Sequence, residues 1–271
     1  SMLFFGASVK PRLEASEDGT NWRKVADIAA MQVPTTVSFA PVTARHFRVV
    51  LEPIARDLPF NSMSPGIDLN GLGAMLGDAG AGAMAGGGNL KIGDLRLSGD
   101  PRIDHFEAKA GFEVERDYYA LSQGLEEVIG IDPAKVIDLT GKMKPDGTLD
   151  WTPPAGRWRV LRLGASLLGT TNHPAPPEAT GLEVDKFDGP AVRRYLEHYI
   201  GMYRDAAGSV GEKGVNAILT DSIEVGAANW TPQMIAQFKR LRGYDPVPWM
   251  PALTGMIVGS RAQSDKFLYD Y

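Results

Sequence analysis

The stretch from Gly214 to Pro232, GVNAILTDSIEVGAANWTP, places two carboxylates directly after an apolar run. The run at 215–219 predicts a short buried strand, and Asp221 and Glu224 follow its carboxyl end. In parallel α/β architectures the loops at that end of the strands converge on one mouth, where catalytic residues gather. The stretch therefore favours a parallel α/β region in which Asp221 and Glu224 are candidate catalytic residues.

The same two carboxylates also have ordinary structural interpretations. Asp221 could cap the helix that follows, and Glu224 could be a solvated loop residue. Paired acids after strands are common in proteins, so the spacing alone leaves these alternatives open.

The composition excludes several classes of function. With 271 residues the chain has room for two ordinary domains, and a net charge of −5 gives no positive surplus for binding nucleic acid. The longest apolar runs fall short of a membrane span. Cysteine is absent, which excludes disulfides and thiolate sites, and the four histidines form no HExxH pair, which argues against a zinc hydrolase. Of the usual catalytic groups, carboxylates remain.

The amino-terminal part has the pattern of an antiparallel sheet. Residues 9–51 alternate apolar and polar positions and are punctuated by Asp18-Gly19-Thr20 and by prolines, and residues 90–97 alternate again. The segments SEDGTNW (16–22) and ARHFRVV (44–50) resemble those of discoidin-like and galactose-binding-like sandwich modules. We expect a β-sandwich in which residues 90–97 form the closing strand, and in which Trp22 anchors the turn or the core rather than a sugar.

A glycine- and alanine-rich tract at 61–88 interrupts this module. Such a tract buries little and costs much entropy to order, which predicts a mobile loop. The tract is not a phosphate-binding loop, because no Lys-Ser or Lys-Thr pair follows the glycines and no βαβ unit surrounds them.

The second half changes to alternating strand and helix signals. We expect a strand at 157–163, a proline-rich loop at 169–180, a helix at 189–204, the strand at 215–219 and a helix at 232–241 that ends at Gly243. This order is typical of a parallel α/β sheet or barrel. The predicted domains are a β-sandwich module at 1–115 and a partial (β/α) barrel at 116–271, with the boundary near 110–130.

Seven motifs in the second half occur in an order that resembles one known family. They are DWTPPAGRW (150–158), RLG (162–164), TNHP (171–174), GLEVDK (181–186), DSIE (221–224), NWTP (229–232) and RGYD (242–245). On these motifs, residues 103–271 resemble glycoside hydrolase family 106, the α-L-rhamnosidases, and the family's usual inserted sandwich accounts for the remainder.

The resemblance implies a (β/α)8 barrel that removes α-linked L-rhamnose with inversion of configuration, with calcium at the active site. It implies that Glu224 is the general acid. An inverting enzyme also needs a carboxylate base about 6.5 to 9.5 Å away, to leave room for the attacking water. Because only two or three barrel strands can be counted here and a whole barrel takes about 250 residues, the base is expected beyond this chain.

Six further residues are expected to bind the sugar. Carboxylates and a lysine suit sugar hydroxyls, and an indole suits the apolar face of a pyranose. The candidates are Asn172, His173, Glu183, Asp185, Lys186 and Trp230. Alternatives stay open: Asp185 and Lys186 could form a surface pair beside a solvated Glu183, His173 could be structural, and Trp230 could pack against the following helix. No contiguous calcium-binding loop is present, so any metal ligands would come from distant residues.

The expected partner is a rhamnose-containing oligosaccharide, polysaccharide or glycoside, with no nucleic acid and no membrane span. The start SMLFF lacks the basic and apolar regions of a signal peptide, so we expect a fragment of a longer protein, and the resemblance implies a periplasmic or extracellular location. The alternative function is a non-catalytic carbohydrate-binding protein that acts through its β-sandwich.

Overall fold

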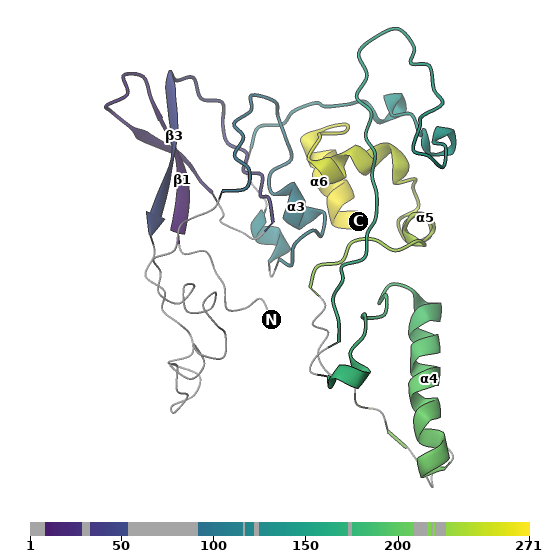
Figure 1. Ribbon diagram of the computed structural model, residues 1–271. Helices are drawn as coiled ribbons and strands as arrows, with labels where there is room; N and C mark the ends of the chain where they lie inside the picture. Colours follow the sequence, from purple (N-terminus) through teal and green to yellow (C-terminus); the bar gives the residue numbers. More distant parts are fainter. Residues whose placement is uncertain are drawn as a thin grey trace, which may run out of the picture.

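The computed structural model describes residues 9–28, 33–53, 92–115, 117–121, 125–172, 175–208, 216–217, 219 and 226–271. These residues form a small antiparallel sheet and several helices (Figure 1). The strands are β1 (Val9–Ser16), β2 (Arg23–Asp27) and β3 (His46–Pro53). The α-helices are α3 (Phe106–Lys109), α4 (Gly189–Ala207), α5 (Met234–Arg242) and α6 (Arg261–Asp270), and the 3-10 helices are η2 (Tyr118–Leu121), η3 (Pro133–Lys135), η4 (Thr140–Lys142), η5 (Pro177–Ala179) and η6 (Val247–Thr254).

The sheet has the order β2-β1-β3, with both neighbours antiparallel to β1. Leu13 of β1 lies opposite Ala26 on one side and Val49 on the other. The carboxyl half of β1 is buried, with Leu13 and Ala15 among the core residues. This confirms the antiparallel sheet expected from the alternation at 9–51.

The turn between β1 and β2 is built on one carboxylate. Asp18 Oδ1 accepts hydrogen bonds from the backbone N–H groups of Thr20 (2.8 Å) and Asn21 (2.7 Å), and these bonds hold the pKa of Asp18 well below its usual range. The indole N–H of Trp22 donates to the Gly19 carbonyl (3.1 Å), and the guanidinium of Arg48 lies 4.0 Å from the centre of the indole ring. Trp22 is therefore a turn anchor, as predicted.

The closing strand expected at 90–97 is wrong in its described part. Residues 92–97 pair with no strand among the described residues, and the side chains of Ile92, Leu95 and Leu97 are exposed. Alternation shows which face of a segment is apolar, but a strand also needs a partner backbone beside it. The second layer of a sandwich is not confirmed, and the tract at 61–88 lies outside the described residues.

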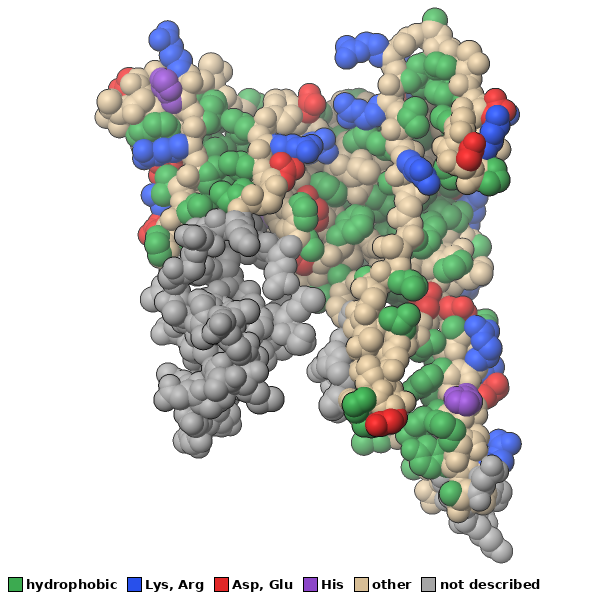
Figure 2. All heavy atoms as spheres, viewed as in Figure 1, with side chains coloured by type: hydrophobic (Ala, Val, Ile, Leu, Met, Phe, Trp, Pro, Cys, Tyr) green, Lys and Arg blue, Asp and Glu red, His purple; other side chains and the backbone are tan. Residues whose placement is uncertain are grey.

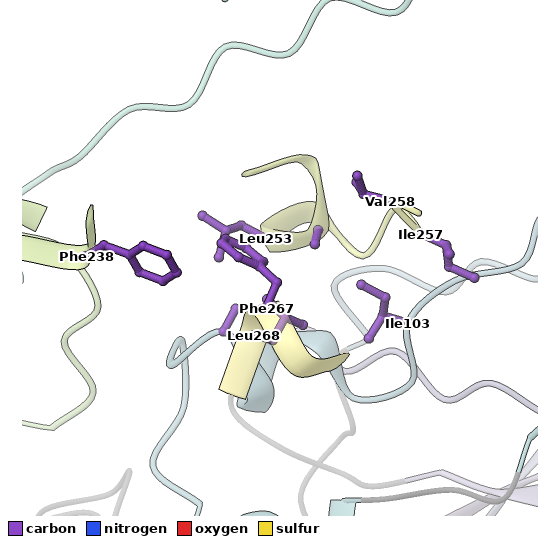
Figure 3. Packing of buried hydrophobic residues seen from close by; sticks show 9 residues of the cluster. Ile103, Phe238, Leu253, Ile257, Val258, Phe267 and Leu268 are labelled. Atoms are coloured by element: carbon purple, nitrogen blue, oxygen red, sulfur yellow. The ribbon is translucent and has the colours of Figure 1, made fainter. Parts of the chain in front are cut away.

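The main hydrophobic core is helical and joins segments that are far apart in sequence (Figure 3). Phe267 of α6 is buried and packs its ring against Phe238 of α5, at 5.8 Å between ring centres, and against Trp249 of η6, at 6.3 Å. The cluster consists of Ile103, Ala110, Phe238, Ala252, Leu253, Ile257, Val258, Phe267 and Leu268.

Two expected helices are confirmed, the first with its predicted start at Gly189 and the second with its predicted end at Gly243. Helix α4 starts after Asp188, whose carboxylate accepts a hydrogen bond from the Ala191 N–H (3.2 Å), and helix α5 ends at Gly243, which has a left-handed φ of 78°. Apolar and aromatic side chains lie exposed along α4, notably Tyr195, Tyr199 and Met202 (Figure 2). None of the described helices is both long and apolar enough to cross a membrane.

The strand expected at 157–163 is also wrong. These residues form no strand, and Trp158, Val160 and Leu163 are exposed. A parallel strand is stable only between neighbours that accept its backbone hydrogen bonds, and the described residues place no such neighbour beside it. The buried strand expected at 215–219 is wrong in its described part, because residues 216–217 and 219 form no strand and Leu219 is 93% exposed. The barrel is therefore not confirmed.

Candidate functional site

The described residues include five of the eight candidate site residues. Asn172, Glu183, Asp185, Lys186 and Trp230 are described, whereas His173, Asp221 and Glu224 lie outside the described residues. The geometry of the site is therefore that of the proline-rich loop, the GLEVDK motif and the NWTP motif.

The proline-rich loop closes on itself at 170–183. Thr171 and Leu182 form an antiparallel bridge, and backbone hydrogen bonds join Asn172 N to Gly181 O (3.0 Å) and Glu183 N to Thr170 O (3.0 Å). The Asn172 amide adds two more bonds within the loop, because its Nδ2 donates to Ala179 O (3.0 Å) and its Oδ1 accepts from Gly181 N (2.7 Å). Asn172 thus holds together the two ends of the segment that precedes GLEVDK.

Glu183 and Lys186 form an ion pair within the GLEVDK motif. The Lys186 ammonium donates to Glu183 Oε2 at 2.5 Å, and both side chains remain partly open to solvent, at 34% and 27% exposure. The pair offers carboxylate oxygens as acceptors and ammonium hydrogens as donors at one place on the surface. The two side chains together carry no net charge.

Asp185 connects this motif to the start of α5. Its Oδ1 accepts from the Phe187 N–H (2.9 Å), and its Oδ2 accepts from the hydroxyl of Thr231 (2.8 Å), 46 residues further along the chain. Thr231 is only 2% exposed. The hydrogen bond therefore fixes an exposed loop to a buried residue of the NWTP motif.

Asn229 attaches the same motif to the helical core. Its side-chain amide donates to Ala110 O (2.9 Å), and its carbonyl accepts from the hydroxyl of Tyr271 (2.5 Å). Tyr271 packs against the core, where burial raises the pKa of its phenol to about 12. Trp230 is half-buried between two anchored neighbours, Asn229 and Thr231.

Sequence reasoning did not single out Asn229 and Thr231, although both belong to the quoted NWTP motif. Their polar groups bond to residues 42 to 119 positions away, and no local pattern carries that information. Within the described ranges, no group of three or more Asp, Glu or His side chains could hold a metal ion.

Comparison with known proteins identifies the family. The family model described as alpha-L-rhamnosidase, glycoside hydrolase family 106, matches residues 10–271. The chain belongs to this family. This chain is also similar to the solved structure of a rhamnosidase from Novosphingobium sp. PP1Y. The two are 50% identical, the match covers 97% of this chain, and the TM-score is 0.76.

A curated relative carries a different name. A protein of Formosa agariphila described as a putative beta-glucuronidase is 42% identical over 141 residues, which are 52% of this family 106 chain. The chain spans 22% of the solved rhamnosidase and 12% of this curated relative, so both are much longer proteins.

Proposed function

We propose that the whole protein is an inverting glycoside hydrolase that removes terminal α-L-rhamnosyl groups from oligosaccharides, polysaccharides or glycosides. The observation that carries this proposal is the match of the alpha-L-rhamnosidase family model to residues 10–271. The Asp185–Thr231 hydrogen bond joins two of the segments that hold the candidate sugar-binding residues, GLEVDK and NWTP. The solved rhamnosidase, at 50% identity, supports the same substrate class.

The proposed architecture is a galactose-binding-like β-sandwich module at 1–115 followed by part of a (β/α)8 barrel at 116–271. The three-stranded sheet at the amino terminus would be one layer of that sandwich. The exposed apolar residues of 157–163 and of α4 are consistent with barrel elements that pack against them in the whole protein.

Sugar recognition follows from the chemistry of the GLEVDK loop. Glu183 accepts hydrogen bonds from sugar hydroxyls and Lys186 donates to them, while Trp230 packs against the apolar face of the ring. Asn172 and His173 belong to the loop that precedes this motif and complete the proposed binding surface. Asp185 contributes to this surface by positioning the motif, since its two oxygens accept from Phe187 and Thr231.

The chemistry proposed for DSIE is general acid catalysis. Glu224 protonates the leaving oxygen, and Asp221, three residues before it, is the second candidate for a catalytic role. A carboxylate outside this chain activates water on the opposite face of the sugar, which yields the inverted product.

Calcium and a periplasmic or extracellular location are parts of the same proposal. The described residues do not fit a calcium site, so its ligands would include side chains outside them. Chelation of the whole enzyme by EDTA tests the metal: activity should fall and return with added calcium, whereas unchanged activity would contradict a calcium requirement.

The substrate class is tested with paired aryl glycosides on the whole enzyme. Turnover of 4-nitrophenyl α-L-rhamnoside is expected, with little or none of 4-nitrophenyl β-D-glucuronide. The reverse preference would sink the rhamnosidase proposal and favour the activity in the name of the Formosa relative. Proton NMR of the first-formed sugar shows directly whether the anomeric configuration is inverted.

The acid role of Glu224 is tested by leaving-group dependence. Glu224→Gln should slow a rhamnosyl disaccharide by about 10² to 10⁴-fold but the 4-nitrophenyl glycoside much less, because nitrophenolate leaves without protonation. Equal losses on both substrates would contradict the acid role. Asp221→Asn tests whether the neighbouring carboxylate also contributes to protonation of the leaving group. Glu178→Gln, which changes an exposed glutamate of η5, is the control.

A further inference from the structure

Asp185 has both carboxylate oxygens engaged by the protein. Oδ1 accepts from the Phe187 backbone within its own turn, and Oδ2 accepts from Thr231. The neighbouring Glu183 and Lys186 pair with each other instead. Among the described residues, Thr231 is the one partner from a distant segment of the chain that hydrogen-bonds a side chain of these three residues.

Thr231 belongs to a firmly held part of the chain. Its side chain is almost completely buried, and its carbonyl accepts from the Met234 N–H (3.0 Å) at the start of α5. Two residues earlier, Asn229 is bonded to Ala110 and to Tyr271. A nearly buried threonine on such a support has little freedom to move, so it can fix the position of a loop that is otherwise exposed.

We infer that Thr231 and Asp185 are a positioning pair: their hydrogen bond holds the GLEVDK loop against the Trp230 segment, so that Glu183 and Lys186 meet the sugar together with the indole. The inference rests on the proposed function, because it assigns the pair to the binding of that same substrate. Asp185 acts through its neighbours, and its own oxygens are occupied by Phe187 and Thr231.

The chemistry predicts which substitutions matter. Valine at 231 has nearly the volume of threonine but no hydroxyl, and it leaves Asp185 Oδ2 without its buried donor. Serine keeps the donor. Since Glu183 and Lys186 would bind substrate and transition state alike, their misplacement should raise KM and leave kcat nearly unchanged.

The experiment compares Thr231→Val, Thr231→Ser and Ser264→Ala in the whole enzyme, by steady-state kinetics on 4-nitrophenyl α-L-rhamnoside and by thermal melting. Ser264 is the matched control, because its hydroxyl is equally buried and bonds Val258 in the core, at 2.7 and 2.8 Å. We expect Thr231→Val to raise KM about tenfold with kcat within about twofold, Thr231→Ser to stay near the wild type, and Ser264→Ala to lower only the melting temperature.

A double-mutant cycle gives the second readout. If the hydrogen bond carries the effect, Thr231→Val should add little to Asp185→Ala, because each change alone already breaks the pair. The inference is overturned if Thr231→Val changes neither constant, lowers kcat alone, raises KM no more than Ser264→Ala does, or adds fully to Asp185→Ala. Failure of the proposed function has a different signature, since the wild-type enzyme itself would then not turn over the rhamnoside.

Discussion

The carboxylate of Glu107 holds Thr36 at two points, although 71 residues separate them in the sequence. The Thr36 N–H donates to Oε2 (2.9 Å) and its hydroxyl donates to Oε1 (2.7 Å), and Glu107 is only 7% exposed. The segment before β3 is thereby attached to α3, next to the helical core. The joint is charge-assisted and largely shielded from water, the conditions under which a hydrogen bond contributes most.

Removing this joint should destabilise the protein. Glu107→Ala is expected to lower the free energy of unfolding by about 2 kcal/mol, since it leaves the N–H and the hydroxyl of half-buried Thr36 unpaired. Glu107→Gln should cost about 1 kcal/mol or less, because an amide can accept from the N–H and donate to the hydroxyl oxygen. Urea unfolding of the whole enzyme measures both, with exposed Glu178→Ala as the control. Equal costs for the two variants would contradict the two-point contact.

A neighbouring histidine makes the same region sensitive to pH. The ring nitrogen Nδ1 of His105 lies 2.7 Å from Oδ2 of Asp104, a 3% exposed residue whose other oxygen accepts from the Ser38 N–H (2.6 Å). The hydrogen bond to Asp104 raises the pKa of His105, against the opposing effects of burial and of Lys109, while Glu107 adds to the rise.

The sign of the pH dependence follows. Because the folded state binds the proton more tightly, His105 contributes its full stabilisation below its ordinary pKa of about 6.5 and loses it as the pH rises through the higher folded pKa. His105→Asn removes the titration and tolerates the left-handed φ of 49° at this position. The variant should therefore lose more free energy of unfolding at about pH 5 than at about pH 9, and an equal loss at both would contradict the pairing.

Gly130 is expected to be irreplaceable for steric reasons. A Cβ at this position would collide with the carbonyl oxygen of Ile257, where two chain segments are joined by the bonds Gly130 N to Gly259 O (2.7 Å) and Ile131 N to Ile257 O (2.8 Å). Gly130→Ala should cost about 3 kcal/mol or more, because backbone cannot yield as a flexible side chain does.

Gly141 is the matched control for Gly130. A Cβ there would meet nothing within 4 Å. Gly141→Ala should change the free energy of unfolding by about 0.5 kcal/mol or less. Chemical denaturation of the two variants side by side is the measurement, and similar stabilities would show that the segments are not packed so closely.

The Asn172 side chain is expected to slow hydrogen exchange in the loop that it closes. Asn172→Ala removes the bonds to Ala179 and Gly181, and hydrogen exchange in residues 175–183 should become about tenfold faster, which corresponds to about 1.4 kcal/mol. Glu178→Ala in the same loop is the control. Unchanged exchange in Asn172→Ala would mean that the backbone bridge alone holds the loop.

Local structure was predictable where a few neighbouring residues suffice to form it. The Asp18 turn with its Trp22 anchor, the start of α4 at Gly189 and the end of α5 at Gly243 depend on caps and turn residues within a few positions. The strand expected at 157–163 failed for the opposite reason, because its backbone needs partners that no local pattern provides.

The candidate site also has one part that the sequence predicts and one part that depends on long-range packing. The sequence by itself determined the family, through the order of its motifs, and with it the choice of Glu183, Lys186 and Trp230 as candidate sugar ligands. Only the tertiary structure decided that Thr231 reaches Asp185 and that Asn229 reaches Ala110. Helix caps and turns form from groups that the chain already holds close together, whereas these bonds exist only after the packing of α3, α5 and α6 has brought distant segments within hydrogen-bonding distance.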